Sequence, residues 1–164
     1  SSSSLYGTQP VYPVKEDATP YPESPYGLTK LVGEQYAQLF ARMYGLEVNC
    51  IRPFNVYGSR QNPLGGYAAA VPSFINKLYV NNPGQITGDG MQSRDFTYVE
   101  DIVDLLVLAS RSDVFGQSFN GGAGRNVSVN YMYQTISKIM NKNIPPEYIP
   151  EVPEPKMTFA DLRT

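Results

Sequence analysis

The chain has 164 residues, enough for one domain with a sizeable core, and its 41% hydrophobic content is ordinary for a globular protein. Its net charge is −2 and its lysines and arginines form no run, which argues against a nucleic-acid or anionic-membrane partner. It contains no histidine, so the usual general base, the usual zinc ligand and every Ser-His-Asp arrangement are excluded.

The chain opens on Ser1-Ser2-Ser3-Ser4, without a methionine, and continues as a loop rich in proline, tyrosine and glutamate up to Glu23. A start inside an element suggests a fragment of a longer protein. No charged-then-apolar leader opens the chain, and no stretch reaches the ~20 apolar residues that a membrane span needs. We therefore expect a cytoplasmic location.

A helix is predicted over residues 25–44. Ser24 is a typical N-cap, Pro25 suits the first helical position, and Gly45 ends the pattern. Apolar residues recur at helical spacing between these ends and give the helix one apolar face. That face consists of Leu28, Leu31, Val32, Leu39, Phe40 and Met43.

The run 46–51 is β-rich and is predicted to be a buried strand, because helix-then-strand order is typical of a βαβ unit. Cys50 lies in this run, and as the only cysteine it is expected to be structural and cannot form a disulfide within the chain. Ligands of open parallel sheets bind beyond the carboxyl ends of the strands. Asn55 and Gly58 follow this strand, so a functional rim is expected there.

Farther along, the segment 67–79 is predicted to be helical, with Pro72 bending or restarting it. Short strands are expected over 85–87 and 94–99, separated by the turn signal Gly88-Asp89-Gly90.

The next helix is expected to begin at Glu100 and Asp101, whose carboxylates favour a helix N-terminus. Its apolar residues are expected to be buried: Ile102, Val103, Leu105, Leu106 and Leu108. The remaining predictions are a strand over 118–120, a tight loop over 121–124, a helix over 129–140 and an extended path over 144–155.

The residues best suited to chemistry are Tyr26 and Lys30 in the first helix. A phenol four residues before an ammonium lies on the same helical face, where the cation favours the phenolate and makes Tyr26 a usable base. Taken alone, the pair also fits an ordinary solvated contact worth a few tenths of a kcal/mol.

Three further motifs favour the functional interpretation: the opening serines, Arg52-Pro-Phe-Asn-Val-Tyr-Gly58, and the segment from Gly88 to Asp101 with Arg94. With Tyr26 and Lys30, and in this order, they resemble the extended short-chain dehydrogenase/reductase family, in its NAD-dependent nucleotide-sugar epimerase and dehydratase branch. The resemblance runs from Ser1 to about Met140. It implies an α/β fold, namely the C-terminal part of a doubly wound, Rossmann-like parallel sheet plus a small α/β substrate-binding portion.

The resemblance also implies a catalytic group. Tyr26 would be the base, Lys30 would favour its phenolate and bind the nicotinamide ribose, and Ser2 would hold the sugar 4-hydroxyl and share its proton. Pro53 would contact the carboxamide of NAD, the implied cofactor, through its backbone. Hydride from C4 of the sugar would pass to NAD and return to the opposite face after the sugar turns over.

The substrate contacts implied by the resemblance come from separate segments. Ser3 and Ser4 would line the sugar pocket, while Asn55 and Arg94 would bind the diphosphate, Arg94 through its planar donors. Without the motif, Arg94 would be expected to form a surface pair with Asp95 or Asp101.

The rest of the implied substrate site lies farther along the chain. Gln85 and Thr87 fall where the family contacts uracil, and Tyr67 would line the same pocket. Glu154 fits the family's C-terminal motif. Thr158 matches a position that sets pocket size, and its small side chain would leave room for an N-acetyl group. The segment from Tyr57 to Pro72 is similar to 4-epimerases that act on UDP-N-acetylhexosamines and on UDP-glucose or UDP-galactose.

Two departures from the family pattern stand out. Glu151 occupies the place of a second diphosphate-binding arginine, where a carboxylate would repel a diphosphate unless Lys156 compensates. The glycine-rich loop that seats the NAD pyrophosphate is missing, and Gly121-Gly-Ala-Gly124 lacks the spacing to replace it. About half of the sheet and most of the NAD site would thus lie outside the chain.

Other branches of the family fit less well. Ser3 and Ser4 stand where a 4,6-dehydratase has an Asp-Glu pair, and a decarboxylase needs glutamate at the place of Ser4. A 3,5-epimerase of the GDP-fucose type uses cysteine and histidine. Elimination and decarboxylation are therefore disfavoured.

The sequence thus predicts NAD-dependent epimerisation at C4 of a UDP-hexose or UDP-N-acetylhexosamine by a longer parent protein, with the isolated chain inactive. The alternatives are an inactive or non-catalytic nucleotide-sugar-binding fragment, or another nucleotide-sugar-modifying member such as a 4,6-dehydratase. Residues 1–60 would belong to the NAD-binding domain and 61–164 mainly to the substrate-binding portion, with 94–115 returning to the former. A homodimer of the parent is expected, and no metal.

Overall fold

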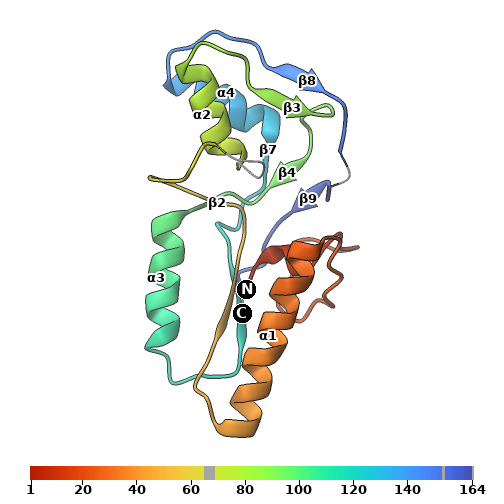
Figure 1. Cartoon of the computed structure of the whole chain (residues 1–164), viewed down its shortest axis with the longest axis vertical. Helices are drawn as coiled ribbons and strands as arrows, with labels where there is room; N and C mark the ends of the chain where they lie inside the picture. The colour runs from red at the N-terminus through yellow and green to blue at the C-terminus, as the bar shows by residue number, and fades with distance from the viewer. Residues whose placement is uncertain (65–68, 153, 164) are drawn as a thin grey trace.

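The computed structural model describes residues 1–64, 69–152 and 154–163. Its elements gather at two ends, with both termini near the middle (Figure 1). At one end, two helices lie on either side of a parallel strand pair: α1 (Pro25–Tyr44), α3 (Val99–Ser110), β1 (Cys50–Pro53) and β6 (Ser118–Gly121). At the other end, two helices pack beside a second parallel pair: α2 (Ala70–Tyr79), α4 (Val129–Ile139), β3 (Gln85–Thr87) and β8 (Glu147–Ile149).

Short strands between the two ends complete the fold. β2 (Val56–Tyr57) pairs in parallel with β5 (Thr97–Tyr98). β4 (Ser93–Arg94) is the middle strand of a small sheet, antiparallel to β7 (Val127–Ser128) and parallel to β9 (Met157–Thr158). A single turn of 3₁₀ helix, η1 (Ser3–Leu5), lies near the N-terminus. Parallel strands flanked by helices on both faces make this part of a doubly wound α/β sheet.

Helix α1 begins and ends where the sequence predicts. The Ser24 hydroxyl accepts a hydrogen bond from the Gly27 N–H at 3.0 Å, and Pro25 occupies the first helical position. Gly45 closes the helix in the left-handed conformation with φ 68°, and its N–H bonds the Ala41 carbonyl.

The apolar helix faces are less buried than expected. On α1 the buried residues are Gly27 and Glu34, whereas apolar side chains such as Met43 are well exposed. On α3 the burial predicted for Val103, Leu106 and Leu108 is wrong, since each is at least half exposed and only Ile102 is buried. The cause is geometric, because the β1–β6 pair is two strands wide and covers a narrow strip of each helix.

Two boundaries also differ from expectation. β1 begins at Cys50 instead of residue 46. Before it, the Val48 carbonyl accepts from the Gly116 N–H at 2.7 Å, and the Asn49 side chain donates to the Ala109 and Val114 carbonyls. Pro72 neither bends nor restarts α2, because it lies in the first turn, where a missing N–H breaks no intrahelical bond. Cys50 is buried and free, as predicted.

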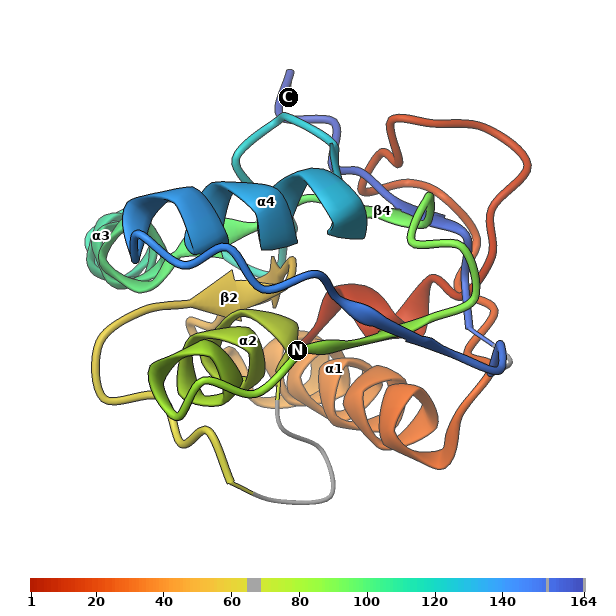
Figure 2. The same cartoon turned by 90° about the horizontal axis from the view of Figure 1, so that it is seen from above.

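The described residues form two separate apolar cores. One lies between α2 and α4, two helices that Figure 2 shows from above, and consists of Phe74, Leu78, Ile86, Val129, Met132 and Tyr133. The other joins the N-terminal segment to the strand ends and consists of Leu5, Tyr6, Val14, Phe54 and Ala160.

A buried polar network adjoins the second core. The Arg52 guanidinium makes a two-point ion pair with Glu34, with Nε donating to Oε2 at 3.0 Å, and also donates to the Tyr6 hydroxyl at 2.6 Å. That hydroxyl donates to Asn120 Oδ1 at 2.8 Å. Burial raises the pKa of Tyr6 to about 12. The network ties α1, β1, β6 and the N-terminal segment together, and the sequence did not predict it.

Candidate active site

Two adjoining clefts share a wall formed by Asn55, Arg94 and Glu154. The larger, of about 700 Å³, is also lined by Ser3, Ser4 and Thr158, among others. The smaller, of about 380 Å³, is also lined by Gln85 and Thr87, and by apolar side chains from α2 and α4. The described residues that the sequence predicts as substrate contacts are therefore brought together in these two clefts.

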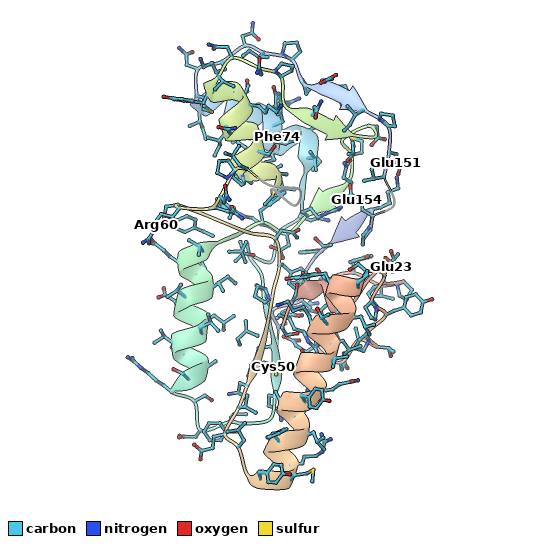
Figure 3. The ribbon with its side chains drawn as sticks, in the orientation of Figure 1. Glu23, Cys50, Arg60, Phe74, Glu151 and Glu154 are labelled. Atoms are coloured by element: carbon cyan, nitrogen blue, oxygen red, sulfur yellow. The ribbon has the colours of Figure 1, made fainter. Side chains whose placement is uncertain are left out.

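The carboxyl ends of β1 and β4 position two of the three residues that form the shared wall. Asn55 is the second residue after β1 and adopts a left-handed backbone with φ 28°, which asparagine tolerates better than most residues. Arg94 ends β4, and the parallel register with β9 sets it opposite Thr158. Glu154 lies on the segment that leads from β8 to β9. Figure 3 shows Glu154 between Phe74, which lies on α2, and Glu23, which lies just before α1.

Arg94 is held by Glu154. Its Nη2 donates to Glu154 Oε2 at 2.8 Å, and its Nη1 donates to the Ser93 carbonyl at 2.9 Å. The Thr87 hydroxyl donates to the other Glu154 oxygen at 3.3 Å. The Arg94 side chain is only 11% exposed, so it is not the surface pair with Asp95 or Asp101 that would be expected without the motif.

Asn55 and Thr158 are joined directly. Asn55 Nδ2 donates to Thr158 Oγ1 at 2.8 Å and to the backbone carbonyl of Asp95 at 3.3 Å. Two residues far apart in the sequence thus form one polar unit on the wall of the larger cleft.

Asp95 is an organising residue that the sequence reasoning missed. Its carboxylate is fully buried and accepts hydrogen bonds from the backbone N–H groups of Ala123 at 2.8 Å, Gly124 at 3.2 Å and Ala160 at 3.2 Å. Burial raises the pKa of Asp95 above its ordinary value, although these N–H groups oppose the shift. Its position directly after Arg94 in the motif was the available signal.

Tyr26 and Lys30 are neighbours, as the spacing predicts. Lys30 Nζ lies 5.2 Å from the centre of the Tyr26 ring, and Tyr26 is 56% exposed. Lys30 also lines a hollow of about 460 Å³ together with Pro53 and with apolar side chains such as Ile51 and Leu106.

This hollow fits the nicotinamide end of NAD in its chemistry. Within the described residues no carboxylate lies within ion-pair distance of Lys30, so its N–H donors are available to ribose hydroxyls. Pro53 and the apolar wall suit a flat ring. The glycine-rich segment that would hold the pyrophosphate is not in the sequence.

Ser2 is placed less directly. It is buried and caps η1, with its hydroxyl accepting from the Ser4 N–H at 3.2 Å, and within the described residues no hydrogen bond joins it to Tyr26. The serine segment nevertheless lies against the first turn of α1, because a Cβ on Gly27 would come within 2.5 Å of the Ser4 carbonyl oxygen. Gly27 was also missed by the sequence reasoning.

Glu151 pairs with Lys156, so that lysine does offset the carboxylate. Tyr67 lies outside the described residues.

Gln92, which was not predicted, lines the smaller cleft and donates to the Thr87 carbonyl at 2.9 Å. In the part of the chain that the structure describes, no group of side chains could hold a metal, and no helix is long and apolar enough to cross a bilayer.

The chain resembles known proteins over nearly its whole length. It is 38% identical over 150 residues to the UDP-glucose 4-epimerase of Mycolicibacterium smegmatis, covering 92% of this chain and 48% of that protein. The chain spans about half the length of the curated relatives it matches.

Solved structures agree in fold. The UDP-N-acetylglucosamine 4-epimerase of Methanobrevibacter ruminantium, solved with UDP-N-acetylmuramic acid, superposes with a TM-score of 0.96 at 36% identity, covering 99% of this chain and 53% of that one. The UDP-glucuronic acid 4-epimerase of Bacillus cereus, solved with UDP-glucuronic acid and NAD, superposes with a TM-score of 0.90 at 35% identity, covering 99% and 51%. The predicted Rossmann-like α/β fold is thereby confirmed.

The model of one protein family matches residues 1–122, about three quarters of the chain. Its description supplies the cofactor that the sequence resemblance implied, NAD. The wall of Asn55, Arg94 and Glu154, the Tyr26–Lys30 pair and this match agree on one conclusion: the chain belongs to the NAD dependent epimerase/dehydratase family.

Proposed function

We propose that the chain is the substrate-binding and proton-transferring part of an enzyme that epimerises C4 of a UDP-hexose or UDP-N-acetylhexosamine. The observation that carries the proposal is the shared wall of Asn55, Arg94 and Glu154, which joins a cleft of about 380 Å³ to one of about 700 Å³. Two adjoining clefts on either side of an arginine suit a ligand with a base at one end, a sugar at the other and a diphosphate between them.

In this proposal the uracil lies in the smaller cleft, against Gln85 and Thr87. The sugar lies in the larger cleft, against Ser3, Ser4 and Thr158, and Arg94 binds the diphosphate. Glu154 offers its carboxylate to ribose hydroxyls.

Proton transfer is proposed to depend on Tyr26, Lys30 and Ser2. Tyr26 takes the proton of the sugar 4-hydroxyl, Lys30 stabilises the phenolate through its charge, and Ser2 orients the hydroxyl. Lys30 and Pro53 would hold the nicotinamide end of NAD, which supplies a reversible hydride acceptor when bound. The serine segment lies against the first turn of α1, which is the turn that carries Tyr26.

Binding is tested first, by titrating the chain with UDP in a calorimeter. Replacing Arg94 with glutamine should weaken UDP binding by about 10-fold to 100-fold, because a charge-assisted hydrogen bond is lost. Arg60→Gln is the matched control, since Arg60 is exposed and lines neither cleft. If the two variants bind UDP equally well, Arg94 does not hold the diphosphate.

Catalysis is tested in the longer parent that the relatives' length implies. Tyr26→Phe in that parent should abolish interconversion of UDP-glucose and UDP-galactose and leave UDP binding intact. The 164-residue chain alone, given NAD, should show no turnover, because it lacks the glycine-rich segment. Measurable turnover by the chain alone would contradict this part of the proposal. The cytoplasmic location and the homodimer of the parent also remain predictions.

A further inference from the structure

Glu23 is a carboxylate that lines the larger cleft and not the smaller one. It directly precedes Ser24, the N-cap of α1, and therefore lies three residues before Tyr26. Figure 3 shows it just before α1, below Glu154. Because Tyr26 is proposed to act on the sugar, Glu23 stands at the sugar end of the proposed ligand and not at its base end.

Glu23 is held in place by the loop that follows η1. Thr8 donates to Glu23 Oε2 from its backbone N–H at 3.2 Å and from its hydroxyl at 3.0 Å. Gly7 lies against the same side chain, since a Cβ on Gly7 would come within 3.2 Å of Glu23 Cγ. Within the described residues no group donates to Oε1, and no lysine or arginine lies within ion-pair distance of Glu23. One oxygen of this carboxylate is thus left for the contents of the cleft.

The charges on the walls of the larger cleft do not balance. In the described structure its charged lining residues are Glu23, Arg94 and Glu154. Arg94 and Glu154 pair with each other at 2.8 Å, and Lys30 lines the separate hollow beside Pro53. The charge that remains at the sugar end is therefore the negative charge of Glu23. It repels an anion placed near it, whereas a hydroxyl group can donate a hydrogen bond to it.

We propose that Glu23 is a specificity-determining residue, which makes the sugar pocket select neutral sugars against sugars that carry a carboxylate. The inference rests on the proposed function, because it names the class of sugar nucleotide that this pocket takes. UDP-glucose and UDP-glucuronate are the suitable probes. They share the base, the ribose and the diphosphate, and they differ in one group on the sugar ring, which is a hydroxymethyl in the first and a carboxylate in the second.

Calorimetric titration of the 164-residue chain with both probes measures the discrimination. The unaltered chain should bind UDP-glucose about tenfold more tightly than UDP-glucuronate, a modest ratio because Glu23 is exposed and water screens its charge. Glu23→Gln keeps the shape of the side chain and removes the charge, so it should lower this ratio to about twofold. A titration of the same variant with UDP reports whether its cleft is folded.

The matched control is Glu47→Gln. Glu47 is also an exposed glutamate, and it lines neither of the two clefts. Its substitution changes the net charge of the chain by the same amount as Glu23→Gln. The ratio of the two affinities should stay at about tenfold in this variant, because the repulsion depends on the place of the charge.

Salt gives a second readout, which needs no substitution. Ions screen a repulsion between charges, whereas they do not change how well a sugar fits the pocket. Raising the salt concentration from about 0.02 M to about 0.5 M should lower the ratio of the unaltered chain to about threefold and leave that of Glu23→Gln unchanged. The diphosphate is common to both probes, so its own salt dependence cancels in the ratio.

Failure of this inference is distinguishable from failure of the proposed function. If the unaltered chain binds UDP but binds the two probes equally, Glu23 does not select the sugar. The same conclusion follows if Glu23→Gln leaves the ratio unchanged, if Glu47→Gln lowers it as much, or if salt has no effect on it. If the unaltered chain binds no UDP, the proposed function is wrong and the role given to Glu23 is overturned with it.

Discussion

Arg94 is already neutralised by a carboxylate before any ligand arrives. Glu154 pairs with its Nη2 at 2.8 Å, on the wall where a diphosphate is proposed to bind. A diphosphate must therefore share the guanidinium with Glu154 or displace it, which reduces the net gain from the new contact. Glu154 does not need its negative charge to accept hydrogen bonds from ribose hydroxyls, because the amide oxygen of a glutamine at this position would accept them too.

Glu154→Gln should for this reason strengthen UDP binding, by up to about fivefold, since the displaced pair is partly exposed. Glu151→Gln is the matched control, because that carboxylate is paired with Lys156 and lines neither cleft. Calorimetric titrations with UDP at low salt provide the comparison. Weaker binding by Glu154→Gln would show that the charge itself serves the ligand.

Tyr6 gives the fold a pH dependence at the alkaline end. The unfolded chain loses a tyrosine proton near pH ~10, whereas burial keeps the folded Tyr6 protonated to a pKa of about 12. Between these two values the folded state therefore holds more protons than the unfolded chain. The contribution of Tyr6 to the free energy of unfolding is complete below pH ~10 and is lost as the pH rises through 12.

Tyr6→Phe should remove the part of the fall in the free energy of unfolding at alkaline pH that Tyr6 causes. It should also lower the free energy of unfolding at pH 8 by about 1–3 kcal/mol, because Arg52 and Asn120 lose their shared partner. Urea denaturation at pH 8 and pH 11 measures both effects. Tyr21→Phe, at an exposed tyrosine, should change neither; an equal response from the two variants would contradict the role given to burial.

Helix α1 contains two glycines with opposite expected behaviour. A Cβ on Gly33 would meet nothing within 4 Å, whereas one on Gly27 would come within 2.5 Å of the Ser4 carbonyl oxygen. Alanine is favoured over glycine by about 1 kcal/mol in a helix interior. The same substitution on one helix thus separates helix propensity from packing.

Gly33→Ala should raise the free energy of unfolding by about 0.5–1 kcal/mol. Gly27→Ala should lower it, because the serine segment must move away from the first turn of α1. Thermal and urea unfolding of both variants provide the measurement. A stabilising Gly27→Ala would mean that the serine segment yields freely, and the proposed placement of Ser2 near Tyr26 would lose its support.

The elements that the sequence predicts well are those with local signals. Ser24, Pro25 and Gly45 define α1 because caps act within a few residues. The ion pair of Arg52 with Glu34 could not be predicted, because it joins residues 18 apart that meet only when α1 packs on β1. The candidate site shows the same contrast between local and distant signals. The spacing of Tyr26 and Lys30 along one helix indicates that they are neighbours, whereas the role of Asp95 depends on hydrogen-bond partners that are distant in the sequence.

Burial was the least predictable property, because it depends on what covers a helix and not on the helix itself. The helical periodicity correctly predicts that Ile102 on α3 is buried, yet it also predicts burial of Leu106, which is half exposed. In the described structure, the narrow β1–β6 pair leaves apolar side chains of both α1 and α3 in contact with solvent. The division of the chain at residues 60, 94 and 115 remains a prediction.

At the scale of the whole molecule, these exposed faces should make the isolated chain bind hydrophobic dyes and associate with itself as its concentration rises. Replacing Val103 and Leu106 together with glutamine should reduce both effects and leave the free energy of unfolding nearly unchanged. Dye fluorescence and analytical ultracentrifugation provide the measurements. Ile139→Gln, at an exposed residue of α4, serves as control; a monomeric chain without dye binding would contradict the expectation.

The buried carboxylate of Asp95 has a mechanical consequence. The chain passes between the two ends of the molecule after β1, after β4 and after β6, and after β9 it runs to the terminus near the middle (Figure 1). Asp95 itself lies on the second of these passages; its carboxylate accepts from Ala123 and Ala160, on the third and the last, and its backbone carbonyl accepts from Asn55, on the first. No single peptide link can then act as a hinge, because swinging one end away would break bonds on the other passages. We therefore expect the cleft wall at that level to keep a fixed width, so that the proposed sugar nucleotide would enter from the open side of the cleft and not by closure of one end over it.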